Sequence, residues 1–215
     1  MKRLQSLVKL GAGKTTITKI LMRLYPINKG KVTIDGYDLN ELSIKSIRNN
    51  ITYISQDSYI FKDTVRKNIV LERNDISDKQ ILDVMEQIGA IPLLERLDNG
   101  LDEVVDINRL SKGELQVIAF IRAIVHKANI YIFDEPTRGI DVGARDEIYN
   151  IMYDLIAKGA SIIMISSDLV EVLKMSDRVV VMREGRINGI VENDGMLTQE
   201  ETMKMELAEE EKHEG

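Results

Sequence analysis

The sequence contains no cysteine and no tryptophan, and it has only three prolines and three phenylalanines in 215 residues. Without cysteine the chain can form neither a disulfide nor a thiolate metal site, which fits a reducing compartment. Two histidines, His126 and His213, are too few to build a histidine-based zinc site. No apolar run approaches the roughly 20 residues that cross a bilayer, so we do not expect the chain to span a membrane.

Positive charge is also in deficit, because 29 Lys and Arg face 35 Asp and Glu and leave a net charge of −6. Most of the excess lies in residues 199–215, where seven Glu and two Lys give −5. The near-neutral remainder argues against nucleic acid as the main partner. We expect the acidic tail to be a solvated, frayed helix.

The remaining composition is that of a globular chain, with 44% hydrophobic and 30% charged residues. Runs rich in β-branched residues predict strands over 51–54, 130–133, 162–165 and 179–182. Because these runs are apolar on both faces and are separated by helices, they predict a mainly parallel, buried sheet. Helices are expected over 14–24 and around 148–155, and residues 31–36 predict an antiparallel strand that ends in a turn.

Between about 57 and 110 the strand pattern disappears. Ser77 and Gln80 predict a capped helix that ends at Gly89. The predicted apolar face of this helix consists of Ile81, Leu82, Met85 and Ile88. The sequence therefore predicts one α/β domain over 1–215, with a helical subdomain over about 57–127 and an acidic tail over about 199–215.

The strongest chemical signal is a glycine-rich segment made of Gly11, Ala12, Gly13, Lys14, Thr15 and Thr16. It follows a strand-like run and opens the helix predicted from residue 14, which is the setting of a phosphate-binding loop. Backbone N–H groups and the helix N-terminus would hold phosphate oxygens. Lys14 would reach the β- and γ-phosphates, and the Thr15 hydroxyl would ligate Mg²⁺. The alternative is a glycine-rich turn without a ligand.

Two carboxylates, Asp134 and Glu135, follow the strand predicted over 130–133. Ligands bind at the carboxyl ends of strands in open α/β sheets. Asp134 could hold Mg²⁺ through water, and Glu135 could act as general base on an attacking water. A solvated turn is the alternative for this pair taken by itself.

A third motif comprises Ser111, Gly113 and Glu114, just before a predicted helix. Ser111 and Glu114 have the spacing of a capping box, which by itself would explain them. A helix N-terminus with a serine and a glycine also binds phosphate, so both interpretations stay open here.

Taken in order, these motifs resemble the ATP-binding cassette family, the nucleotide-binding domains of ABC transporters. The resemblance extends from about residue 5 to about residue 205 and includes Gln56 after the strand 51–54 and Gly139-Ile-Asp141 after the carboxylate pair. It implies a P-loop NTPase fold with a mainly parallel core, a small antiparallel subsheet and a helical insert. It also implies binding and hydrolysis of ATP with Mg²⁺.

The resemblance assigns roles to further residues. Gln56 is similar to the glutamine that senses Mg²⁺ and the membrane partner, and Asp141 to the residue that couples two ATP sites. Ser111 and Gly113 are similar to the signature that touches the γ-phosphate held by the opposite protomer. The family pairs head-to-tail with a second cassette, as a homodimer or heterodimer, and with transmembrane subunits at the cytoplasmic face of the membrane.

Several positions depart from the family pattern. Val8 stands where the phosphate-binding loop usually begins with glycine, and the signature reads Leu-Ser-Lys-Gly-Glu over 110–114 where Leu-Ser-Gly-Gly-Gln is typical. Ser167 occupies the position of the catalytic switch histidine, although residues 166–168 also fit a helix cap. The aromatic residue that stacks on adenine lies in a family segment upstream of this sequence.

The two halves resemble different branches of the family. Residues 30–69 are similar to exporter-type ATPases of the multidrug or lipid class, whereas residues 134–187 are similar to the second cassette of ribose- or galactose-type sugar importers. The patterns meet near 135–137. We therefore expect an ATP-hydrolysing transporter domain with weakened activity. The alternatives are a degenerate regulatory module with little turnover and a soluble ATPase that acts on ribosomes or DNA.

Overall fold

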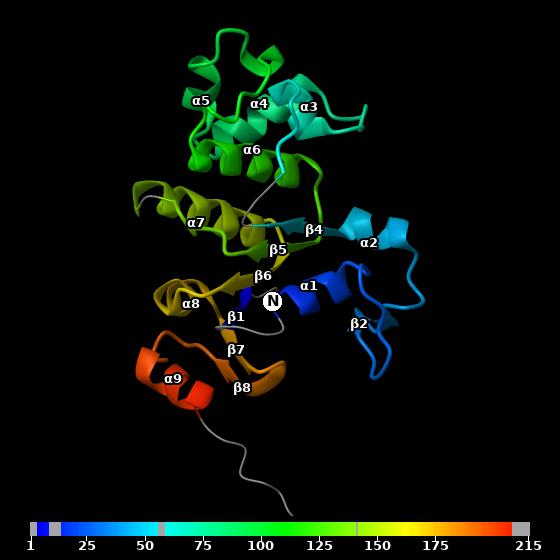
Figure 1. The fold of residues 1–215 in the computed structure, drawn as a ribbon, viewed down its shortest axis with the longest axis vertical. Coiled ribbons are helices and arrows are strands. Elements are labelled where there is room, and N and C mark those ends of the chain that lie inside the picture. Colours follow the sequence, from blue (N-terminus) through cyan, green and yellow to red (C-terminus); the bar gives the residue numbers. More distant parts are fainter. Residues whose placement is uncertain (1–3, 9–13, 56–58, 141, 208–215) are drawn as a thin grey trace, which may run out of the picture.

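The structure is a computed structural model, and it describes residues 4–8, 14–55, 59–140 and 142–207 (Figure 1). A six-stranded sheet forms its core in the order β4-β5-β6-β1-β7-β8. The strands are β1 Leu4–Val8, β4 Ile51–Ile54, β5 Ile130–Asp134, β6 Ser161–Ser166, β7 Arg178–Arg183 and β8 Arg186–Glu192. All pairings from β4 to β7 are parallel, and β8 pairs antiparallel with β7. The predicted mainly parallel sheet is confirmed.

Helices cover both faces of this sheet, as the side chains of β5 demonstrate. Ile132 packs in a cluster with Ile47 of helix α2 (Ile44–Asn50), against which residues of helix α1 (Lys14–Leu21) also pack. Phe133, one position along the strand, belongs to a second cluster with residues of α6 (Lys112–Val125), α7 (Val142–Ala157) and α8 (Leu169–Met175). The alternation follows from the two-residue period of a strand and explains why these runs are apolar throughout.

A small hairpin joins α1 to α2. Strands β2 (Thr33–Ile34) and β3 (Tyr37–Asp38) pair antiparallel across a two-residue turn, Asp35-Gly36. Both turn residues have positive φ, 50° and 86°, as a type I′ hairpin turn requires. The strand and turn predicted over 31–36 are thus confirmed.

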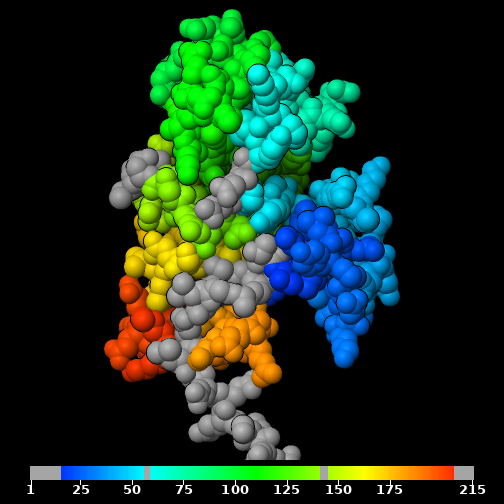
Figure 2. Space-filling view, in the orientation of Figure 1, coloured from blue at the N-terminus to red at the C-terminus, as the bar shows by residue number. Residues whose placement is uncertain are grey.

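The insert between β4 and β5 is helical in its described part. It contains α3 Val65–Val70, α4 Asp78–Gln87, α5 Ile91–Glu95, the 3₁₀ helix η1 Gly100–Asp102, and α6. These elements form a lobe at one end of the molecule (Figure 2). The capping box predicted at Ser77 is present, because its side chain accepts from the Gln80 N–H and Gln80 bonds back to the Ser77 N–H.

Two details of the helices differ from the predictions. Leu82 is not on the buried face of α4, since 38% of it is exposed while Ile81 and Met85 are fully buried. Helix α1 ends at Leu21 and not at residue 24, because Arg23 turns to a φ of 50° and its N–H bonds to Ile20.

Of the predicted acidic tail, residues 199–207 form a helix that is mostly exposed but packs on the sheet at two positions, and residues 208–215 lie outside the described residues. Helix α9 (Gln199–Leu207) lies beside β8 in Figure 1, with Thr202 buried and Met205 against the backbone of Gly189. Within the described ranges, each helix is too short or too polar to cross a bilayer.

Candidate nucleotide-binding and catalytic site

Three of the predicted site residues, Asp134, Glu135 and Ser167, lie where the parallel strands β5 and β6 end at one edge of the sheet. Asp134 ends β5 and pairs in register with Ile165, one residue before β6 ends at Ser166. Val8 ends β1 opposite Ser166, and α1 begins six residues later at Lys14. The carboxylate pair and the end of β1 therefore share the edge at which ligands bind in such sheets.

Part of the predicted site lies outside the described residues. This applies to Gly11, Ala12, Gly13, Gln56 and Asp141. Lys14 and Thr15 are described only through the backbone of α1, and Thr16 is exposed in the first turn of that helix.

Asp134 is held by a tyrosine that the sequence did not single out. The Tyr53 hydroxyl, on the neighbouring strand β4, donates to Asp134 Oδ2 at 2.7 Å. Burial and this bond raise the pKa of Tyr53, so the hydroxyl keeps its proton as a donor. Thr18 of α1 is buried and bonds to the same tyrosine. Asp134 is thereby tied to the helix that follows the glycine-rich loop.

Glu135 occupies a constrained position directly after β5. It is a non-glycine residue with a φ of 51°, and 9% of it is exposed. Its N–H donates to the Ile165 carbonyl at 2.7 Å. Its carboxylate oxygen Oε2 accepts bonds from the Ser167 N–H at 3.1 Å and the Ser167 hydroxyl at 2.9 Å. The structure thus brings together Glu135 and Ser167, which are 32 residues apart in the sequence.

The helix cap expected at 166–168 is present, and Asp168 provides it. Its Oδ1 accepts from the N–H groups of Val170 and Glu171 at the start of α8, at 3.0 and 3.2 Å. Because Asp168 caps the helix, the Ser167 hydroxyl is left to face Glu135.

The motif at Ser111 is a complete capping box on α6. The Ser111 hydroxyl oxygen accepts from the Glu114 N–H at 3.2 Å, and the Ser111 N–H donates to Glu114 Oε2 at 2.7 Å. Arg96 forms an ion pair with the same carboxylate. Although burial opposes ionisation, the bonds from Ser111 and the charge of Arg96 lower the pKa of Glu114. The structural interpretation of Ser111 and Glu114 is therefore correct, whatever else they bind.

A sequence profile described as ABC transporter matches residues 9–138, more than half of the chain. The chain belongs to the ABC transporter family. This family is characterised by ATP binding and ATP hydrolysis, and its cassette is a P-loop NTPase fold, as the resemblance predicted.

A ribose import protein and a lipid flippase are among the relatives similar to this ABC domain. A ribose import ATP-binding protein from Geobacillus kaustophilus is 36% identical over 207 residues, which cover 91% of this chain and 41% of the relative. An ATP-dependent lipid A-core flippase from Escherichia coli is 32% identical over 198 residues, which cover 88% of this chain and 34% of the relative. The occurrence of both kinds agrees with the two patterns in the sequence.

Among solved structures, a bacterial Atm1-family ABC exporter with ATP bound matches the chain with a TM-score of 0.84 and 28% identity. The match covers 97% of this chain and 37% of the exporter chain. This ABC domain thus spans well under half the length of the relatives it matches.

The donor set of the described part fits Mg²⁺ bound together with a nucleotide. Mg²⁺ usually takes one or two carboxylates and completes its shell with phosphates and water. Asp134 supplies one such carboxylate at the strand edge. Within the described ranges, no three His, Asp or Glu side chains form a metal-binding group. An all-protein metal cage is therefore not what this part of the ABC domain offers.

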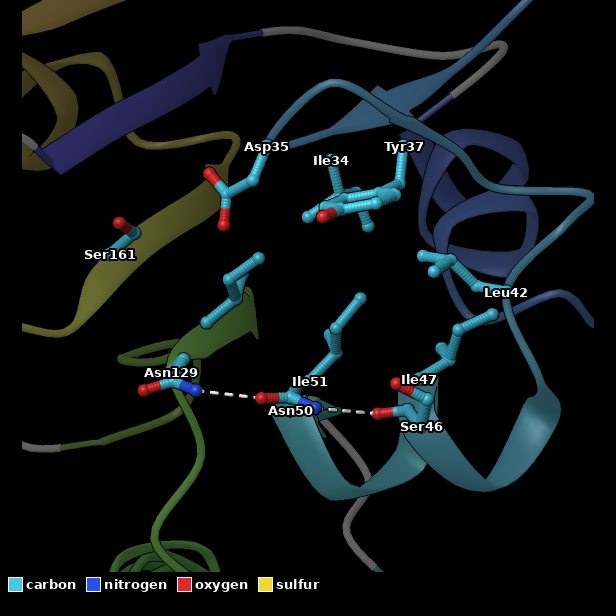
Figure 3. Close-up of a pocket in the computed structure, with 11 residues that line it drawn as sticks. Ile34, Asp35, Tyr37, Leu42, Ser46, Ile47, Asn50, Ile51, Asn129 and Ser161 are labelled. Carbon is cyan, nitrogen blue, oxygen red and sulfur yellow. Dashed lines mark hydrogen bonds between the residues drawn. The ribbon is translucent and has the colours of Figure 1, made fainter.

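A hollow of about 540 Å³ lies away from this edge, at the amino ends of the strands (Figure 3). It is lined by the hairpin, α2 and the first residues of β4, β5 and β6. Its side-chain amides are already hydrogen-bonded within the protein, since Asn129 donates to Asn50 at 2.7 Å and Asn50 donates to the Ser46 carbonyl at 2.9 Å. This hollow is separate from the edge at which β1, β5 and β6 end, and we assign it no ligand.

Proposed function

We propose that this chain is the part of an ABC transporter that binds and hydrolyses Mg-ATP to drive transport across a membrane. The observation that carries the proposal is the placement of Glu135. Its carboxylate stands at the carboxyl edge of a parallel sheet, at which β1 also ends, in a chain of a family of ATPases.

In this proposal each residue has a separate task. Lys14 and the N–H groups of Gly11–Thr16 bind the β- and γ-phosphates. Glu135 takes a proton from the attacking water as general base. Thr15, Gln56 and Asp134 would hold Mg²⁺, which when bound neutralises charge on the phosphates.

The proposed partner at the ATP site is a second cassette, identical or different, arranged head-to-tail. Ser111 and Gly113 of one chain would then face the γ-phosphate bound by Gly11–Thr16 of the other, and Asp141 would couple the two sites. The phosphate would meet the N-terminus of α6, which attracts anions but already holds the Glu114 carboxylate.

We place the membrane subunit on the groove between β4, α3 and α6. This groove has a volume of about 220 Å³ and includes Tyr59 and Leu71, whose exposed fractions are 71% and 41%. Exposed apolar side chains in a groove favour an amphipathic helix as the partner. The Nη2 atom of Arg122, also in the groove, is buried without a hydrogen-bond partner among the described residues. The chain would accordingly work at the cytoplasmic face of the membrane.

Lys14→Ala should weaken ATP binding about tenfold or more, because a charge-assisted hydrogen bond contributes roughly 1.5–3 kcal/mol. Isothermal titration calorimetry with ATP in the absence of Mg²⁺, so that ATP is not hydrolysed, would measure the dissociation constants. Lys19→Ala is the matched control, since Lys19 lies on the same helix but bonds to the Tyr25 hydroxyl at 3.4 Å. Equal ATP affinity of wild type and Lys14→Ala would contradict the proposed phosphate site.

We further propose that turnover is weak, because Ser167 replaces an imidazole with a short neutral hydroxyl that already bonds to Glu135. Ser167→His should raise phosphate release about tenfold, below the ~10²–10³ that one positioned donor can contribute. The smaller gain is expected because Val8, Lys112 and Glu114 are unchanged. The rate is measured by phosphate release at saturating ATP.

Ser167→Ala distinguishes two causes of such a gain. It removes the hydroxyl bond to Glu135 without supplying an imidazole, so its rate should stay at or below that of wild type. An equal rise in the Ala and His variants would mean that releasing Glu135 limits turnover. No rise in the His variant, in protein that binds ATP and dimerises, would mean that the missing histidine does not limit turnover.

A further inference from the structure

Glu171 is a buried carboxylate behind the proposed catalytic pair, on helix α8. Only 3% of it is exposed. Its Oε2 accepts from the Ser166 hydroxyl at 2.5 Å, and its Oε1 accepts from the Thr137 hydroxyl at 2.8 Å. A third hydroxyl, that of Tyr149 on α7, also bonds to it. One side chain therefore joins β6, the loop after β5, and α7.

The electrostatics of this cluster keep the hydroxyls as donors. Burial and the nearby charge of Glu171 raise the pKa of Tyr149 to about 12, so Tyr149 keeps its proton. Burial also raises the pKa of Glu171, with a contribution from Asp168, against the bonds from Ser166 and Thr137. Burying a carboxylate costs free energy unless its oxygens accept hydrogen bonds. The position of the Glu171 side chain therefore depends on these contacts.

Two of the three hydroxyls belong to the segments that carry the proposed catalytic groups. Thr137 lies two residues after Glu135 in the same tight loop, where the Arg138 N–H bonds to the Glu135 carbonyl at 3.2 Å. Ser166 directly precedes Ser167, whose N–H and hydroxyl hold the Glu135 carboxylate. Glu171 thus bonds to a residue on each side of the Glu135–Ser167 contact, through Thr137 and Ser166.

The backbone conformation of Glu135 has to be held in place by its surroundings. A φ of 51° in a residue with a side chain is a strained conformation that persists only where its surroundings determine it. On one side the Glu135 N–H is bonded to Ile165 of β6. On the other side the loop is fixed through Thr137, which is 2% exposed and bonded to Glu171.

We infer that Glu171 is a positioning residue that aligns Glu135 and Ser167 through Thr137 and Ser166. The inference rests on the proposed function, in which Glu135 is the general base. A buried ionisable side chain that served packing alone would affect stability but would not separate the rate of hydrolysis from ATP binding.

The test uses the full chain and compares kcat, KM and the ATP dissociation constant. Thr137→Val keeps the shape of the side chain but removes the donor to Glu171, whereas Thr137→Ser keeps the hydroxyl. We expect Thr137→Val and Glu171→Gln each to lower kcat about tenfold, as small misplacements of catalytic groups do, while KM and the dissociation constant stay within about twofold. Thr137→Ser should retain the wild-type kcat.

Two reference variants calibrate the assay. Glu135→Gln defines the rate without the general base. Thr202→Val removes an equally buried hydroxyl from α9, where it donates to the Thr198 carbonyl at 3.0 Å, and should leave kcat unchanged. The double variant of Glu171→Gln and Thr137→Val should be no slower than the slower single variant, because both break the same connection.

The outcomes separate the two proposals. A wild-type rate no higher than that of Glu135→Gln would overturn the proposed function and the positioning role together. A wild-type rate above it, with Thr137→Val and Glu171→Gln unchanged, would overturn only the positioning role. The positioning role would also be overturned if kcat of these variants fell only in proportion to the number of ATP-binding sites lost. An equal fall of kcat in Thr202→Val would overturn it as well. If Glu171→Gln does not fold, the Val and Ser variants of Thr137 decide the question.

Discussion

Glu135→Gln should lower phosphate release by about 10²–10⁴-fold while ATP binding is retained. A positioned general base contributes a factor of that size, and glutamine has nearly the same shape without the basic oxygen. Its amide oxygen can still accept from the Ser167 N–H, which holds the side chain of Glu135 at 3.1 Å in the wild type. Steady-state phosphate release and calorimetric ATP titration of the same preparations would measure the two effects.

Glu147→Gln provides the matched control for this charge change. Glu147 is an exposed carboxylate on α7, so its neutralisation alters the net charge by the same amount away from the strand edge. Its phosphate release should equal that of wild type. Equal rates in wild type and Glu135→Gln, in protein that binds ATP, would remove Glu135 from the proposed mechanism.

Phe120→Ala should lower the free energy of unfolding by about 3–5 kcal/mol, the usual cost of deleting a buried phenylalanine ring. Phe120 is fully buried on α6 and stacks on Phe133 with ring centroids 5.5 Å apart. Phe133 directly precedes Asp134, so the same contact supports the strand end that carries the carboxylates. Urea unfolding followed by circular dichroism would measure the loss.

Phe61→Ala is the control for this prediction, because Phe61 is 46% exposed and should cost within about 1 kcal/mol. The wild type should unfold in one cooperative transition, since α6 and α7 share one core although they lie on opposite sides of the junction near 135–137. Similar losses for both variants, or two separate transitions, would show that the insert does not share the core of the sheet.

Strands β4, β5, β6 and β7 were predictable because they are apolar on both faces, whereas β8, which is exposed or half-buried along its length, was not predicted. A run such as residues 130–133 is apolar at every position, so neither the register nor the helices around it were needed to recognise a strand. The caps at Ser77 and Ser111 were predictable for a different reason, since each depends on residues three positions apart in the chain.

The contacts that shape the proposed catalytic edge were not predictable in the same way. Glu171 stands in an amphipathic pattern where a carboxylate usually faces water, and its burial depends on Thr137 and Ser166 from other elements. Tyr53 has the sequence pattern of an ordinary strand residue, and its bond to Asp134 depends on the pairing of β4 with β5. Leu82 shows the converse, because an apolar residue next to a buried one on a helix can still face solvent.

The capping box of α6 has a consequence for any association through this helix end. The Ser111 N–H and the Arg96 guanidinium are already engaged by the Glu114 carboxylate, which a lowered pKa keeps ionised at neutral pH. The first turn of α6 therefore supplies its own anion to the positive end of the helix dipole. A phosphate group arriving from a second chain would have to displace a tethered carboxylate, so binding there is an exchange of one anion for another. Salt would screen the attraction of both anions to the helix end, so the effect of salt on phosphate binding depends on how much more strongly it screens one than the other.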